Sequence, residues 1–135
     1  MTISIQESID NFSAIFVVVR IKDYYFNFDI DTGSSYNIIF DYVYNQFPQG
    51  FEATNKSSDI FGIDGKYNTC PTVKCNLCFD NQSYETEFQV ICANDAVNNV
   101  QKDLGVQLHG VLGMQFLKDN NCVIDFANKT IKIGE

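Results

Sequence analysis

The sequence lacks long apolar segments and has few of the residues that interrupt secondary structure. Its 135 residues include two prolines, one histidine and one arginine. No apolar run approaches the roughly 20 residues of a membrane-spanning helix, so we expect no membrane association. Because hydrophobic residues make up 45% of the chain and prolines are rare, we expect a folded domain and not a disordered chain. A histidine-based catalytic pair could use only His109, which precedes Gly110 at a predicted helix end and is expected to contact the terminal carbonyls there instead.

The charge and the cysteine count limit the partners and the compartment. The formal net charge of -8 would repel nucleic-acid phosphates, so no nucleic-acid partner is expected. Five cysteines, an odd number, favour free thiols in a reducing compartment over a disulfide framework. The N-terminal segment has neither the basic start nor the small-residue cleavage site of a signal peptide. A cytoplasmic location is therefore expected.

Apolar and β-branched residues indicate short strands within one domain over residues 1–135. Between the strands, polar and glycine-containing turns recur, and two later segments alternate apolar and polar residues as a hairpin does. The sequence therefore predicts a mostly β domain. Strands are expected over residues 14–21, 24–30, 36–40, 73–79 and 84–90.

Helices are expected to be few and short. Residues 41–47 precede Pro48 and fit one short helix. Apolar residues spaced by three or four between Val97 and Leu108 predict a second, with Asn94 or Asp95 as its N-cap and an interruption near Gly105. Another short helix could begin within GVLGMQFL, and the segment CVIDFANKTIKI predicts a closing hairpin.

The segment FNFDIDTGSSYNIIF, residues 26–40, carries the strongest functional signal. Asp31 ends an apolar strand, Gly33 permits a tight reversal, and Ser34 and Ser35 supply hydroxyl groups before a new strand begins. A carboxylate there would lie on a rigid loop among small hydrogen-bond donors. Taken alone, the segment fits a catalytic aspartate and an ordinary turn aspartate equally well.

Four segments together resemble the retropepsin family, the single-domain aspartic proteases of retroviruses, retrotransposons and related cellular and bacterial proteins. FDIDTGSSYNII is similar to the family's catalytic loop, and IFGIDGK lies where the family has its flap hairpin. GVLGMQFL resembles the motif that crosses behind the catalytic loop, and CVIDFANKTIKI resembles the closing hairpin of non-viral members. The resemblance implies a closed-barrel acid protease fold, mostly β, with one or two short helices.

The resemblance also implies roles for the residues of the loop. Asp31 would be the catalytic residue, and Thr32 would make a hydroxyl contact across a dimer. Gly33 would bind the substrate backbone, and Ser34 would hydrogen-bond an outer oxygen of Asp31. Bonds within the turn are an alternative for Thr32 and Ser34 and are compatible with these roles.

Two other motifs would complete such a site. Ile63, Asp64 and Gly65 would form the tip of a flap that closes over the peptide. The alternative for this turn is a surface hairpin without function. Residues 111–113, which are Val111, Leu112 and Gly113, would form the motif behind the catalytic loop.

One Asp-Thr-Gly supplies one catalytic aspartate, so a two-aspartate site needs a second copy of the chain. A twofold axis would bring two identical loops together, which predicts a homodimer. Two adjacent carboxylates share one proton and titrate as a unit. The ionised member would activate a water, and the protonated member would hydrogen-bond the carbonyl of a peptide or protein substrate. This chemistry requires no metal and no cofactor.

Two features depart from the viral pattern. Gly113 is followed by Met114 where the viral enzymes have Gly-Arg, so the viral inter-subunit salt bridges are not expected here. The closing hairpin also suggests an interface unlike the interleaved termini of the viral dimers.

Strand alternation predicts that Asp29 shares a face with Asp31 at the wall of the cleft. The alternative is that local twist turns Asp29 to solvent.

Two other functions compete with the protease. A catalytically silent, dimeric peptide-binding or assembly module would share the fold, but the intact sequence of residues 31–34 favours the enzyme. A thiol-based metal or redox domain could use Cys70, Cys75 and Cys78. Strand alternation places Cys75 and Cys78 on opposite faces, and no second ligand pair follows, so a zinc site is not expected.

Overall fold

Strands make up most of the regular secondary structure in a computed structural model that describes residues 1–61 and 67–134. Within these ranges it describes every side chain except those of residues 60, 61, 67 and 68. The helices in this part of the chain are short. The prediction of a mostly β domain is therefore confirmed. No helix in the described ranges is long and apolar enough to cross a membrane.

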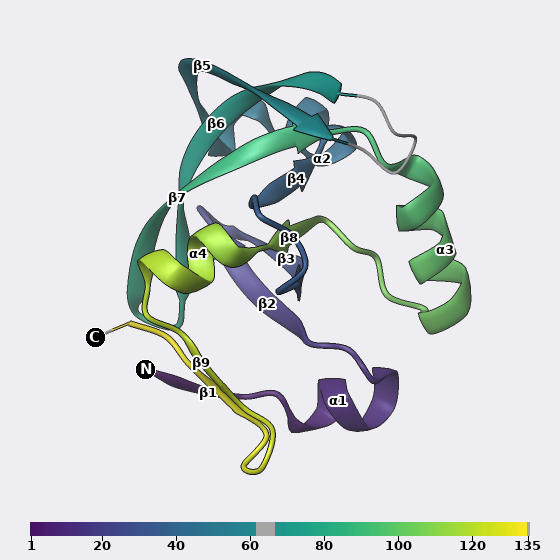
Figure 1. Ribbon diagram of the computed structural model, residues 1–135, viewed down its shortest axis with the longest axis vertical. Helices are drawn as coiled ribbons and strands as arrows, with labels where there is room; N and C mark the ends of the chain where they lie inside the picture. The colour runs from purple at the N-terminus through teal and green to yellow at the C-terminus, as the bar shows by residue number, and fades with distance from the viewer. Residues whose placement is uncertain (62–66, 135) are drawn as a thin grey trace.

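Six strands close into a barrel, and a seventh lies at its edge (Figure 1). The order is β2 (Phe16–Ile21), β3 (Tyr24–Ile30), β8 (Gly110–Leu112), β4 (Ile38–Phe40), β7 (Gln82–Ile91), β6 (Tyr67–Phe79) and β5 (Glu52–Phe61). Closure occurs where β2 and β6 pair at Arg20 and Cys78, which leaves β5 paired with β6 alone. β2 and β3 form a hairpin, as do β5 and β6 and then β6 and β7.

Alternating apolar residues fill the barrel. In β2, Val17 and Val19 are buried while Val18 between them is 59% exposed. In the centre, Phe28 and Phe88 pack with ring centroids 5.5 Å apart, and neither is exposed to solvent. Burying side chains of this size contributes about 1.5–3 kcal/mol each to stability, so this alternation is what fixes each strand's inward face.

The helices lie around the barrel and differ in part from the predictions. α2 (Asp41–Gln46) agrees closely with its predicted range and leads into a 3-10 turn, η1 (Pro48–Gly50). α3 (Asn94–Leu104) ends where the interruption was predicted, because Gly105 adopts a left-handed conformation with φ 71°. α4 (Met114–Asp119) follows β8 directly. The N-cap of α3 is Ala93, so the predicted caps one or two residues later were wrong.

The two ends of the chain pair with each other outside the barrel. β1 (Thr2–Ser4) pairs with β10 (Thr130–Lys132), which forms the closing hairpin with β9 (Val123–Asp125). Figure 1 shows this three-stranded ribbon apart from the barrel, with both termini beside it. A short helix, α1 (Gln6–Phe12), connects β1 to the barrel and was not predicted. The expected closing hairpin is present.

Candidate active site

The segment around Asp31 is anchored by a strand that comes from the far end of the sequence. β8 lies between β3 and β4, pairing Leu112 with Ile30 on one side and Val111 with Ile38 on the other. The Asp31 backbone N–H donates to the Leu112 carbonyl at 3.0 Å. The loop from Asp31 to Asn37 therefore connects β3 to β4, and β8 lies between these two strands.

Gly113 allows β8 to pass directly behind this loop. A Cβ at this position would lie 2.6 Å from the Ser34 carbonyl oxygen and closer still to that of Tyr36, so no side chain fits. The next residue, Met114, donates its backbone N–H to the Ser34 carbonyl at 2.7 Å. Val111 and Leu112, the other two residues of the predicted motif, are buried. The structure thus places all three behind the Asp-Thr-Gly segment.

Asn37 connects the loop to three other elements and was missed by sequence reasoning. Its side chain is 1% exposed, and its Oδ1 accepts from the N–H groups of Gly113 at 3.0 Å and Phe116 at 3.2 Å. Its Nδ2 donates to the Glu87 carbonyl at 3.1 Å. The sequence signal for this role was the polar Asn37 directly before the apolar residues of β4. Each of these bonds contributes on the order of 1 kcal/mol, and leaving the buried partners unsatisfied costs more.

The Asp31 carboxylate is exposed at the start of the loop. Its Oδ1 accepts from the Gly33 N–H at 2.8 Å, and its carbonyl accepts from the Ser34 N–H at 3.2 Å. The Ser34 hydroxyl donates to the Tyr36 carbonyl at 2.7 Å. Since a hydroxyl has one hydrogen, Ser34 supports the loop from within and does not make the expected bond to Asp31 in the single chain. Thr32 and Gly33 are exposed beside Asp31.

Asp29 lies in the same hollow as Asp31. The hollow has a volume of about 520 Å³, and Ile15 and Phe126 contribute to its wall. Burial, and then the charge of Asp31, raise the pKa of Asp29 to about 6. Asp29 is therefore half-buried on the Asp31 side of β3, and of the two orientations considered, the shared face is the one observed.

The structure describes only part of the segment predicted to form the flap. β5 and β6 form the two arms of a hairpin and pair as far as Phe61 and Tyr67, with a shift of register between Ala53 and Ser57. The predicted tip, Ile63, Asp64 and Gly65, lies outside the described residues.

His109 lies beside Asn27 of β3 and does not line the hollow of Asp29 and Asp31. The expected contact with helix-terminal carbonyls is wrong, because α3 ends at Leu104 and His109 instead precedes β8. The His109 ring Nδ1 accepts from the Asn27 backbone N–H at 2.9 Å, and the His109 backbone N–H donates to the Asn27 carbonyl at 2.9 Å. Burial lowers the pKa of His109. The neutral ring therefore acts as a structural acceptor at the entrance to β8.

The cysteines lie on the faces that strand alternation predicted. Cys75 is buried with Val73 and Leu77, whereas Cys78 is partly exposed. Burial raises the pKa of Cys75 to about 12 and that of Cys122 to about 11, so both stay protonated near neutral pH. Within the described part of the chain, no three His, Cys, Asp or Glu side chains gather into a group that could hold a metal ion.

Solved structures reveal which proteins share this barrel. The retroviral protease-like domain of Ddi1 from Leishmania major matches 89% of this chain and 87% of its own, with a TM-score of 0.59 and 13% identity. The chain has a retropepsin-like fold. A retropepsin-like aspartic protease from Rickettsia conorii also matches, over 97% of this chain and 87% of its own, with a TM-score of 0.56 and 13% identity. No protein-family model matches the sequence, and no curated protein matches it.

These likenesses confirm the predicted retropepsin-like fold, closed barrel included. At 13% identity they establish the fold and leave the chemistry to the residues of this chain. The retropepsin-like chain presents one Asp-Thr-Gly, at the end of β3 and in front of β8.

Proposed function

We propose that this chain is an aspartic endopeptidase that acts as a homodimer. The observation that carries the proposal is the exposed Asp31 carboxylate, on a loop held by Leu112 from behind and by Gly33 from within, in a retropepsin-like barrel. A rigid, solvent-facing carboxylate is what a water-activating group requires. Because the chain has one such aspartate, the second must come from a partner copy.

The proposed reaction uses the two Asp31 carboxylates as one titrating unit. Their mutual repulsion disfavours double ionisation, so the pair holds one proton. The ionised carboxylate takes a proton from a water that attacks the peptide carbonyl, while the protonated one donates a hydrogen bond to the carbonyl oxygen. Thr32, exposed next to Asp31, is the proposed contact between the two loops, and Gly33 the proposed contact with the substrate backbone.

The terminal strands support a dimer unlike that of the viral enzymes. β1 pairs with β10 of its own chain at every one of its residues, so its hydrogen bonds on that side are already made. The proposed interface therefore does not depend on interleaved termini. It centres instead on the catalytic loops and the neighbouring exposed side chains, which include the 66% exposed Phe126 at the mouth of the Asp31 hollow.

A digest of a peptide library by the wild-type chain and by Asp31→Asn tests the proposal. The wild type is expected to cleave, and the variant is not. Activity per chain should also fall on dilution through the dimer dissociation constant. Full specific activity in a proven monomer would contradict the shared site. Peptide binding without cleavage by the wild type would instead indicate the silent binding module.

A further inference from the structure

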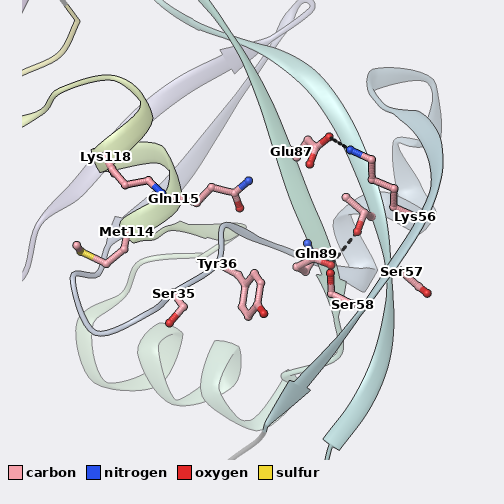
Figure 2. A pocket seen from close by; sticks show the side chains of 11 residues that line it. Ser35, Tyr36, Lys56, Ser57, Ser58, Glu87, Gln89, Met114, Gln115 and Lys118 are labelled. Atoms are coloured by element: carbon pink, nitrogen blue, oxygen red, sulfur yellow. Dashed lines mark hydrogen bonds and ion pairs between the residues drawn. The ribbon is translucent and has the colours of Figure 1, made fainter.

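A second, larger hollow lies on the other side of the catalytic loop. It has a volume of about 670 Å³ and opens between β5 and β7 on one side and α4 on the other (Figure 2). Ser35 and Tyr36, which continue the catalytic loop, contribute to its wall. This volume falls in the usual range for ligand pockets, so the hollow can receive a side chain with its adjoining backbone. Asp29 and Asp31 do not line it and belong to the separate hollow described above.

The charge of this pocket is opposite in sign to that of the chain. Its wall contains Lys56, Lys118 and Glu87, which sum to +1, whereas the whole chain carries -8. Lys56 and Glu87 form an ion pair at 3.1 Å and offset each other. Lys118 forms no ion pair with any residue that the structure describes. The unpaired positive charge favours an anionic ligand.

Buried polar groups add a hydrogen-bond donor to the same pocket. Thr72 is 3% and Gln89 4% exposed, and the Thr72 hydroxyl donates to Gln89 Oε1 at 2.9 Å. This bond uses the acceptor end of the Gln89 amide and leaves its NH2 group to donate. Among the described residues, the Gln89 NH2 group has no hydrogen-bond partner, whereas every side-chain nitrogen that is fully shielded from solvent has one. The NH2 group is therefore accessible, and it faces the pocket that Gln89 lines. Figure 2 shows Lys118 extending from α4 on the side facing β7.

We propose that this pocket is an outer substrate subsite that selects an acidic side chain, with Lys118 and the Gln89 amide as its donors. The proposal rests on the endopeptidase function proposed above. A carboxylate bound there would receive a charge-assisted hydrogen bond, which is stronger than a neutral one. The negative hollow at Asp29 and Asp31 disfavours an acidic residue beside the scissile bond. The favoured peptide therefore carries its acidic residue away from the cleaved bond.

Matched peptides test the subsite. Each outer position of a cleaved peptide carries Glu, Gln or Lys in turn, and kcat/KM is compared within each set. The wild type should prefer Glu over Gln roughly fivefold at one outer position, the size expected for a partly exposed ion pair. Lys118→Gln should abolish this preference, and Lys118→Glu should replace it with a preference for Lys. Lys102→Gln, an exposed lysine on α3 outside the pocket, should keep it.

Failure of the subsite and failure of the enzyme give different results. If the wild type cleaves with equal kcat/KM for Glu and Gln at every outer position, or if Lys118→Gln retains the preference, the subsite proposal is wrong while the endopeptidase stands. If the wild type cleaves nothing, the endopeptidase is wrong. The subsite is then decided by the binding of fluorescently labelled library peptides to Asp31→Asn, measured by anisotropy for pairs that differ only in Glu or Gln at one position. Equal affinity for Glu and Gln peptides there overturns it.

Discussion

The carboxylates of Asp29 and Asp31 line one hollow, and the charge of Asp31 adds to the burial that raises the pKa of Asp29 to about 6. The two residues leave the same face of β3 because side chains alternate along a strand. The single chain therefore contains an interacting carboxylate pair of its own. The proposed dimer would bring four carboxylates together, two from Asp29 and two from Asp31. Substituting one residue at a time distinguishes the effects of Asp29 from those of Asp31.

Replacing Asp29 should change the pH dependence of stability. The folded chain binds a proton at Asp29 more tightly than the unfolded chain, whose pKa is near 3.8. Stability is therefore lost as the pH rises from about 4 to about 6. Asp29→Asn should raise the free energy of unfolding above pH 6 and alter it little below pH 4. Urea denaturation at both pH values measures the difference, with Asp23→Asn in an exposed turn as the control. An equal effect at both would contradict the raised pKa.

Replacing Asp31 should lower the pKa of Asp29. Asp31→Asn removes the repelling charge, but burial is the larger cause of the shift, so the value should stay above 3.8. An NMR titration of the Asp29 carboxyl carbon reports this in the single chain, independently of catalysis. The same variant should retain the fold by circular dichroism and lose cleavage. An unmoved Asp29 pKa would show that the two carboxylates do not interact.

Asp29 should also influence the proposed reaction. In Asp29→Leu the dyad loses a neighbouring negative charge, so it should ionise more readily. The acidic limb of the pH–rate profile is then expected to move to lower pH. Peptides with an apolar residue beside the cleaved bond should gain in kcat/KM relative to those with a basic one. If neither the profile nor the preference changes, Asp29 does not contact the substrate.

The Asn37 amide should be a main source of loop stability. Asn37→Ala removes three hydrogen bonds and leaves buried backbone donors of Gly113 and Phe116 without their acceptor. We expect a loss of about 2–4 kcal/mol in the free energy of unfolding. Thermal or urea denaturation measures it against Asn98→Ala, an exposed position on α3. A loss no greater than that of the control would rule out this role.

Acid should weaken the fold through His109. Burial lowers the pKa of this residue in the folded chain, so the unfolded chain takes up the proton first. The corresponding stability is complete above pH about 6.5 and is lost as the pH falls below that value. Protonation would also remove the acceptor for the Asn27 N–H. His109→Gln should reduce the change in the free energy of unfolding between pH 5 and 7, as measured by chemical denaturation. If that change is the same in the variant, it arises from other groups.

The parts of the fold that follow from local patterns could be predicted. β3 was predicted with its observed bounds because polar Lys22 and Asp23 precede it and Asp31 ends its apolar run. The faces of Cys75 and Cys78 follow from alternation alone. Likewise, the Asp-Thr-Gly and the motif at Gly113 could be related to each other through the family resemblance.

Features that depend on distant contacts could not be predicted in this way. α1 has seven residues, and it is positioned by Ser8, whose hydroxyl donates to the Ala14 carbonyl and accepts from the Phe16 N–H. Glu87 alternates with the buried residues of β7, yet it pairs with Lys56 from β5 at the pocket wall. No local pattern carries such information, since each of these contacts exists only after the barrel has closed.

The insertion of β8 between β3 and β4 also orders events during synthesis of the chain. Asp31 emerges from the ribosome long before residues 110–114, whose carbonyl and amide groups hold its loop. A nascent chain can form the hairpin of β2 and β3 and the meander of β5, β6 and β7 from neighbouring segments. It cannot shape the loop of Asp31 until residues 110–114 have been synthesised, because that contact closes a long stretch of sequence. The aspartate thus acquires its geometry late, after the hairpins that precede β8 in the sequence have been able to form.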